Sequence, residues 1–520
     1  MIEIDEILKK CGDFHRYQFL LLFLFSIINI LSSMHYYSQT IISFVPEHWY
    51  VLNEISLVVK TSPEMICYNR GSGEYDKPCK RWDYNFDFGY KSMTSDLNWV
   101  CDAAWKSALG QSMFFVGSVI GSLCLGVLAD IVGRVPVLII ANMLAFIGNF
   151  STVFAWTVVS FSLCRFVSGL ATDSNFVMMY ILVMEYLRSS KRTAGLSICI
   201  GIFYCLGSVL TPWLAVVAGN WKMFLIFSSG PILVVPLFYF VVPESAQWLI
   251  SIKRYDKAIK CFQTIAKLNR RHVDDSDFKD FRLKCENGLA SASRKSNVLG
   301  LFKTPRLRRH TLILFFKSMI ITLCYDATSR NVEGLGMSPF VMFSLSATAI
   351  LPACVVLLVL QDKIGRKAMA SSSLLLSGIF TSSLGLAIAY GMPRGENPYI
   401  LAALATIGRF GVTVAYNSGA QYAAELIPTC VRAQGIAAVH VVGYAFTFFS
   451  SYILLLSKIS KSIPALLLGV LSLIGAGLCL FLPETLDREL PCTLEDGENF
   501  GRGERFLDFA CCKMKREDKK

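Results

Sequence analysis

The feature that most constrains this chain is a series of apolar blocks, each close to the roughly 20 residues that a helix needs to cross about 30 Å of hydrocarbon. These blocks contain almost no charged residues. An open sheet cannot satisfy its backbone hydrogen bonds in lipid, so each block is expected to be a helix. The sequence therefore predicts an all-α integral membrane protein with twelve spans. They lie at approximately 17–38, 107–129, 135–156, 158–184, 195–219, 223–243, 311–329, 338–360, 368–391, 399–424, 435–457 and 463–483.

Composition and charge agree with the bilayer as solvent. Hydrophobic residues make up 54% of the chain and charged residues 17%, whereas soluble domains are about 45–50% apolar. Twelve spans place both termini on one side, and the short loops on that side hold Arg134, Arg188, Lys191, Arg192, Lys363, Arg366, Lys367 and Arg432. The opposite short loops hold only Lys222, Arg330, Arg394, Lys458 and Lys461. The positive-inside rule predicts cytoplasmic termini. A basic surface facing anionic lipid explains the net charge of +12 without a nucleic-acid partner.

Two long polar segments organise the chain. The second one separates six spans from six, so we take it as the boundary between two halves. The expected parts are a cytoplasmic N-terminal segment 1–16, a first half 17–243 with an extracellular loop 43–106, a cytoplasmic linker 244–310, a second half 311–483 and a cytoplasmic tail 484–520. In the linker, Tyr255–Asn269 places its apolar residues on one helical face, which suits a helix against the membrane or the inner mouth. Cys67, Cys79 and Cys101 share the extracellular loop, where disulfides are permitted, and their pairing stays open.

The two halves repeat each other in sequence. The repeats are Gly126–Arg134 with Gln361–Arg366, Arg165-Phe166 with Arg409-Phe410, Glu185 with Glu425, and Pro243-Glu244-Ser245 with Pro483-Glu484-Thr485. Self-similarity in a fixed order reports a duplicated architecture. Halves related by an axis along the membrane normal are typical of transporters.

The repeated charges predict an inner latch. Glycine allows a tight reversal in the Asp–Gly–Arg turns, where the aspartates can accept hydrogen bonds from a helix N-terminus. The arginines of these turns can reach the glutamates that end the fourth and tenth spans. We expect the latch to be closed when the cavity faces outward and broken when the halves rock. Its residues are Asp130, Arg134, Glu185, Arg188, Asp362, Arg366, Glu425 and Arg432. The alternative is that these charges only orient the loops during membrane insertion.

Several motifs carry a family resemblance that extends over nearly the whole chain. They include Pro46-Glu47-His48, Trp99-Val100-Cys101-Asp102, Leu128–Arg134, Pro243–Leu249, Pro305–Leu312, Glu425–Thr429 with Arg432, and Leu482–Thr485. In these motifs the sequence resembles the solute carrier 22 group of organic cation, organic anion and carnitine transporters, within the major facilitator superfamily. The resemblance implies a twelve-span fold of two six-helix halves, a plasma-membrane location and transport of small organic ions by alternating access.

The sequence does not decide whether the substrate is a cation, an anion or a zwitterion. Cation-type members tend to carry acids in the eighth and eleventh spans, and anion-type members carry bases there. In this chain the corresponding position of the eighth span is Ile350 or Cys354, and that of the eleventh span is Tyr444. Neither the acidic nor the basic signature is therefore present.

Five residues are candidates for substrate binding: Lys317, Tyr325, Asp326, His440 and Tyr444. Lys317 and Asp326 are nine residues apart, about half a helical revolution, so they cannot pair along one face. Lys317 is expected to face the cavity and bind a substrate carboxylate, or to pair with Asp173. Asp326 either contacts substrate or forms an i,i+4 pair with Arg330. His440 either titrates beside substrate or is a satisfied core histidine.

The expected function is transport of an organic cation, anion or carnitine-like zwitterion. The alternative is a receptor or scaffold that keeps the fold without transporting. An enzyme is not expected, because no His-Glu-x-x-His, P-loop, dinucleotide-binding or nucleophile-elbow motif lies in a credible setting. No metal or cofactor is predicted, and the oligomeric state is left open.

Overall fold

Twelve helices long and apolar enough to cross a membrane run through the part of the chain that the structure describes. The computed structural model confirms the predicted number of spans and the helical fold class. It describes residues 2–12, 15–50, 68–69, 77–78, 82–187, 198–290, 298–333, 335–390, 398–486, 488, 490–503 and 508–509.

Several spans of the first half are broken helices. The N-terminal bundle contains α2 (Arg16–Ile42), α4 (Trp105–Val132), α5 (Arg134–Thr152), α6 (Val158–Gly169) with α7 (Ser174–Tyr186), the π-helix η4 (Ile200–Tyr204) with α9 (Cys205–Ala218), and α10 (Trp221–Ser229) with the 3₁₀ segment η5 (Gly230–Phe240). Pro231 and Pro236 in η5 remove backbone donors, which explains why the sixth span does not continue as α-helix.

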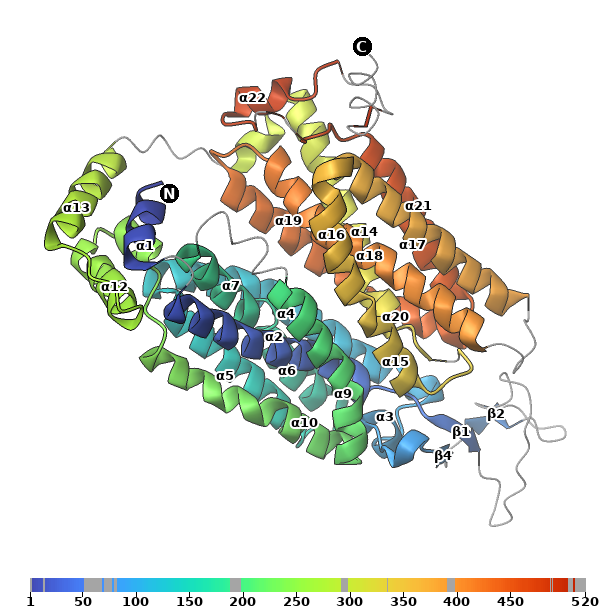
Figure 1. Cartoon of the computed structure of the whole chain (residues 1–520). Coiled ribbons are helices and arrows are strands. Elements are labelled where there is room, and N and C mark those ends of the chain that lie inside the picture. Colours follow the sequence, from blue (N-terminus) through green and yellow to red (C-terminus); the bar gives the residue numbers. More distant parts are fainter. Residues whose placement is uncertain are drawn as a thin grey trace.

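The second half also has six spans, of which the eighth and the eleventh are broken. The C-terminal bundle contains α14 (Pro305–Arg330), α15 (Pro339–Thr348) with α16 (Ile350–Ile364), α17 (Arg366–Ala389), α18 (Pro398–Leu426), α19 (Arg432–Thr447) with α20 (Ser450–Leu455) and η7 (Leu456–Lys458), and α21 (Ile463–Leu480). In Figure 1 the two bundles meet beside the β-strands and diverge toward the end where α1 (Ile2–Gly12) and α22 (Leu494–Asn499) lie.

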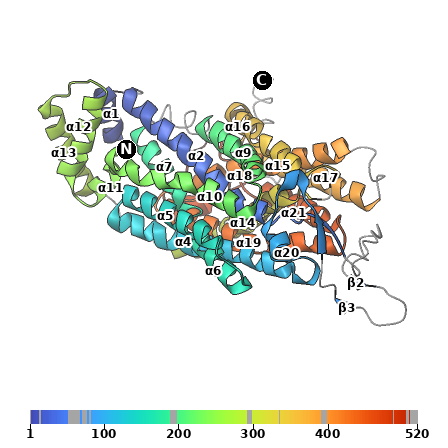
Figure 2. The same ribbon diagram turned by 90° about the horizontal axis from the view of Figure 1, so that it is seen from below.

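The short elements outside the spans define two faces. The terminal face carries α1, α11 (Ala246–Ser251), α12 (Tyr255–Leu268), α13 (Asp275–Ala290), η6 (Val298–Phe302) and α22. The loop face carries β1 (Glu47–Tyr50), β2 (Tyr68–Asn69), β3 (Lys77–Pro78), β4 (Trp82–Asn85), η2 (Asp87–Gly89), α3 (Met93–Asp96) and η3 (Cys101–Ala103). Strand β1 pairs antiparallel with β4, and β2 with β3. Figure 2 shows α12 and α13 at one end of the molecule and β2 and β3 at the other.

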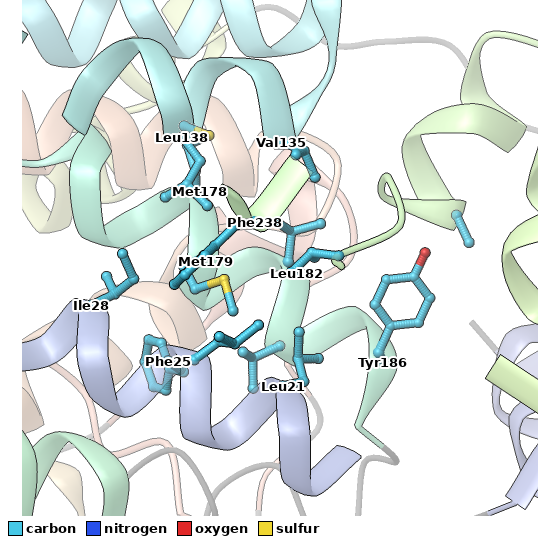
Figure 3. Close-up of a cluster of buried hydrophobic side chains, with 14 of the residues drawn as sticks. Leu21, Phe25, Ile28, Val135, Leu138, Met178, Met179, Leu182, Tyr186 and Phe238 are labelled. Atoms are coloured by element: carbon cyan, nitrogen blue, oxygen red, sulfur yellow. The ribbon is translucent and has the colours of Figure 1, made fainter. Parts of the chain in front are cut away.

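The largest apolar core lies where α2, α5 and α7 meet in the N-terminal bundle (Figure 3). Phe25 and Ile28 of α2 face Met179 and Leu182 of α7, and Phe238 of η5 closes the cluster. Because lipid tails are as apolar as these side chains, close packing rather than exclusion of water holds such helices together.

Small residues let neighbouring helices approach closely in both bundles. A Cβ atom added at Gly117 would lie 2.2 Å from the carbonyl oxygen of Phe166, and one at Gly411 would lie 2.7 Å from the carbonyl oxygen of Ser373. These glycines place α4 against α6 and α18 against α17. Substitution by alanine would therefore push the helices apart in either bundle.

The turns predicted from the duplicated Gly–Arg motifs are present. Gly133 has φ 112° and Gly365 has φ 96°, a region that side-chain-bearing residues rarely adopt. Each glycine ends one span and directly precedes the arginine that begins the next.

The predicted linker helix is α12, and its apolar face packs on protein. Ala258, Phe262, Ile265 and Ala266 are buried. The Phe262 ring lies 6.4 Å from the ring of Tyr186 at the end of α7, and α12 also packs against α1. The linker is therefore docked on the N-terminal bundle. Cys101 is disulfide-bonded, and the other two loop candidates, Cys67 and Cys79, lie outside the described residues.

Candidate functional site

A buried ion pair of α14 hydrogen-bonds to residues of the other half near the loop face. Asp326 and Arg330 of α14 lie 3.1 Å apart, with 0% and 2% of their side chains exposed. The Asp326 carboxylate also accepts a hydrogen bond of 2.8 Å from the Tyr36 hydroxyl of α2, and Arg330 donates one of 2.9 Å to Gln111 of α4. The i,i+4 pair considered for Asp326 is confirmed. In this conformation its carboxylate is satisfied by protein groups and is closed off from water.

A second set of contacts joins the two halves, farther from the loop face than the Asp326–Arg330 pair. The guanidinium of Arg409 in α18 donates a hydrogen bond of 2.8 Å to the Tyr37 hydroxyl of α2. The Tyr37 and Tyr325 hydroxyls lie 3.4 Å apart, and Arg409 also lies over the Tyr325 ring at 5.3 Å. Tyr325 is thus placed among these interface groups.

Further contacts between the two halves lie closer to the loop face. The Ser112 hydroxyl donates to the carbonyl of Phe448, and the backbone amide of Val45 donates to Glu333. The rings of Phe44 and Phe340 pack at 5.3 Å. Together these interactions hold α2 and α4 against the C-terminal bundle, so the pathway is closed toward the loop face.

An acidic residue from the first half faces the second half near mid-membrane. Asp173 lies in the break between α6 and α7, and its carboxylate accepts a hydrogen bond of 2.8 Å from Ser122 of α4. Asp173 also lies near Tyr444 and His440 of α19. The Tyr444 hydroxyl lies 3.2 Å from that of Tyr416. The break in the fourth span is what directs this carboxylate toward α19.

A small cavity of about 40 Å³ lies beside this contact, between α14, α18 and α19. Lys317, Tyr416 and His440 contribute to its lining, and the imidazole of His440 is exposed. Lys317 is 2% exposed, with its ammonium 3.4 Å from the carbonyl of Gly419 and 4.8 Å from the centre of the Tyr422 ring. Among the described residues, no carboxylate lies within 4.0 Å of the Lys317 ammonium, so the suggested pairing with Asp173 is not formed here.

The latch residues of the first half form a cluster within that half. Arg134 pairs with Asp130 at 3.0 Å and donates a hydrogen bond to the Ala129 carbonyl. Glu185 accepts hydrogen bonds from the Ser245 hydroxyl and the Gln247 backbone amide.

The second half has the matching cluster. Arg366 pairs with Asp362 and with Glu425, each at 3.1 Å. Glu425 also accepts a hydrogen bond from the Thr485 hydroxyl. The Arg432 guanidinium donates to the Ile427 carbonyl, and Arg188 lies outside the described residues.

Two glutamates that sequence reasoning did not single out cap helix N-termini. Glu244 accepts a hydrogen bond of 2.8 Å from the Arg134 amide at the start of α5, and Glu484 accepts one of 2.9 Å from the Arg366 amide at the start of α17. The aspartates of the turns were expected in this role, and the structure assigns it to these glutamates. The repeated Pro-Glu-Ser and Pro-Glu-Thr motifs were the available signal, because carboxylates favour helix N-termini.

Comparison with known proteins decides the family. The model of the family described as "Sugar (and other) transporter" matches residues 49–492. Organic cation transporter 1 of Caenorhabditis elegans is 32% identical to the chain, covering 82% of it and 72% of that protein. The chain belongs to the solute carrier 22 group of the major facilitator superfamily. Organic cation/carnitine transporter 2 of Homo sapiens is 31% identical over 82% of the chain and 75% of that protein.

Solved structures agree on the fold. The inward-open xylose transporter XylE of E. coli aligns with a TM-score of 0.63, covering 92% of this chain and all of XylE at 16% identity. The predicted family and the predicted fold of two six-helix halves are confirmed. Members of this superfamily are membrane transporters, so the chain is a transporter and not an enzyme.

Proposed function

We propose that this protein moves small organic ions across the plasma membrane by alternating access, with both termini in the cytoplasm. Relatives named as organic cation and carnitine transporters support the substrate class. The excess of basic residues on the terminal face supports the orientation. The described structure then represents the state closed toward the outside.

The substrate is bound between the halves, where Asp173 approaches Tyr444 and His440. This meeting of ionisable side chains carries the proposal. Asp173 lies 15 residues from Val158 and 13 from Tyr186, the two ends of its span, which places it near the middle of the bilayer. A ligand there touches both halves, and a ligand changes a conformational equilibrium only by binding the two states differently.

A charged group of the opposite sign lies at a similar depth in the other half. Lys317 is 12 residues from Pro305 and 13 from Arg330, the ends of α14. A buried ammonium near the Gly419 carbonyl, the Tyr422 ring and Cys479, with no described carboxylate within 4.0 Å, has unused capacity to bind an anion. A zwitterion would present its ammonium to Asp173 and its carboxylate to Lys317.

The remaining candidates have separate roles in this proposal. His440 and Tyr444 contact the substrate, and Tyr325 forms the floor of the site, because its ring stacks on Tyr416 at 4.7 Å. Asp326 lies four residues from the loop-face end of α14, so we assign it to closure of the outer gate.

The test is mass-spectrometric accumulation of organic cations, anions and zwitterions in cells that express the protein at a verified surface level. Wild type should concentrate zwitterions. Lys317→Met should lose the preference for a carboxylate, and Asp173→Asn the preference for an ammonium group. Lys363→Met and Asp83→Asn remove exposed charges away from the site and should behave as wild type.

The alternative of a receptor or scaffold predicts a different result. It predicts no accumulation of any class despite normal surface expression. If the protein accumulates substrate but both site variants keep the wild-type selectivity, transport stands and the proposed site is wrong.

A further inference from the structure

A groove of about 430 Å³ lies on the C-terminal bundle, away from the contact between the halves. It is formed by the first turns of α14 and the end of α21, two helices that pack against each other. Its lining residues are Pro305, Arg308, Arg309, Leu312, Ile313, Phe316 and Phe481. The groove shares no residue with the candidate substrate site.

The α14 residues of the groove form one helical stripe. Steps of three and four residues lead from Pro305 through Arg308 and Arg309 to Leu312, and then to Phe316. The charges are confined to the end nearest the terminal face, and the deeper turns are apolar. Phe316 is 54% exposed, so the stripe faces outward toward lipid.

The depth of the stripe matches the boundary between headgroups and acyl chains. Helix α14 has 26 residues, which at about 1.5 Å per residue makes it roughly 39 Å long. The hydrocarbon core is only about 30 Å thick. The first turn of α14 therefore extends into the headgroup layer, where Arg308 and Arg309 lie, and Leu312 and Phe316 reach the acyl chains.

Arg308 and Arg309 can bind an anion, because their charges are not paired with a described carboxylate. Among the described residues, no carboxylate lies within 4.0 Å of either guanidinium. Arg306 differs, because Glu498 of α22 accepts its backbone amide hydrogen bond and interacts favourably with its charge. Arg309 is held over the Phe481 ring at 5.5 Å, which fixes a cation at the upper edge of the groove.

We propose that this groove is a binding site for an anionic phospholipid of the leaflet on the terminal face. Arg308 and Arg309 hold the phosphate and the anionic headgroup, because a guanidinium donates two parallel hydrogen bonds to phosphate oxygens. One acyl chain lies along Leu312 and Phe316, against Phe481. The site does not depend on the identity of the transported substrate.

The test is native mass spectrometry of the purified full-length protein in mixed micelles of dioleoyl phosphatidylserine and dioleoyl phosphatidylcholine. Wild type should retain phosphatidylserine in preference to phosphatidylcholine. Each basic side chain at an anionic surface contributes about fivefold to affinity, so the double variant Arg308→Ala/Arg309→Ala should bind roughly 30-fold more weakly. Phe316→Ala should also weaken retention, because it shortens the apolar contact.

The matched control is Lys303→Ala/Arg306→Ala, which removes the same charge from the same end of α14 outside the groove. It should leave retention within about twofold, because Lys303 and Arg306 do not line the groove and the charge of Arg306 already interacts with Glu498. Thermal unfolding in phosphatidylcholine alone should be the same for both double variants, which excludes misfolding. Equal losses in both would indicate diffuse attraction and overturn the site. If soluble glycerophosphoserine displaced the bound lipid at concentrations similar to that of the lipid, the occupant would be a free headgroup and not a phospholipid. Equal retention of phosphatidylcholine would also contradict the proposal.

Discussion

Tyr36→Phe should shift the protein away from the state closed toward the loop face. The change deletes one hydroxyl, whose hydrogen bond to Asp326 spans 2.8 Å between the halves. The Asp326–Arg330 ion pair lies wholly within α14 and remains. The bond is therefore lost from one conformational state without leaving a buried charge unpaired.

The size of the shift follows from the type of bond. A hydrogen bond to a charged group contributes about 1.5–3 kcal/mol. Since about 1.4 kcal/mol is a factor of ten in an equilibrium constant, the ratio of open to closed molecules at the loop face should rise about 10- to 150-fold.

Hydrogen-exchange mass spectrometry measures this shift without labels. Peptides from the loop-face ends of α2 and α14 should take up deuterium faster in the variant. The matched control is Tyr422→Phe, which deletes a buried hydroxyl that donates a 2.7 Å hydrogen bond to Pro483 within the C-terminal bundle. If the two variants exchange alike at the loop face, the Tyr36 bond does not hold the halves together.

Three further predictions concern charged side chains. Lys317→Met should raise the KM for a carboxylate-bearing substrate about tenfold in uptake assays, because roughly one ion pair with the substrate is lost. The unfolding temperature should be unchanged or raised, because the variant removes a buried ammonium. Asp173→Asn should raise the KM for an ammonium-bearing substrate by a similar factor, whereas Ser122→Ala, which removes only a hydrogen bond to that carboxylate, should change it about threefold or less. Glu484→Gln should destabilise the protein by about 0.5–2 kcal/mol in thermal unfolding, because it weakens the cap of α17, and Glu495→Gln, an exposed residue in the first turn of the short helix α22, should have a smaller effect.

The spans were predictable from sequence because hydropathy and helix length are local properties. The Asp326–Arg330 pair was readable in the same way, since four residues correspond to one helical turn. The break between α6 and α7 was missed, because 158–184 was treated as one apolar run, although Gly169 and the polar stretch Thr172–Asn175 mark the interruption. That break decides where the carboxylate points.

Contacts between the halves were not predictable from spacing. Tyr36 and Asp326 are 290 positions apart, and Tyr37 and Arg409 are 372 apart. Arg409 repeats Arg165 in sequence, which predicts equivalent positions in the two halves. Arg165 stays within its own half, hydrogen-bonded to Asn149, whereas Arg409 crosses to the other half. A repeat in sequence thus predicts equivalent positions without predicting equivalent partners.

The placement of the polar contacts indicates how the protein can have two states of similar energy. The described hydrogen bonds that cross the halves lie from mid-membrane to the loop face, and the described charge clusters of the terminal face are satisfied within one half. Opening the loop face breaks the first set, so new contacts on the terminal face must offset the loss. Asp130 and Asp362 are suited to this, because their side chains are 75% and 78% exposed while the paired arginines are 18% and 11% exposed. Solvent weakens an ion pair whose carboxylate is exposed, and each arginine keeps a second partner, the Ala129 carbonyl for Arg134 and Glu425 for Arg366. We therefore propose that each aspartate leaves its arginine and binds a group of the other half when the terminal face closes.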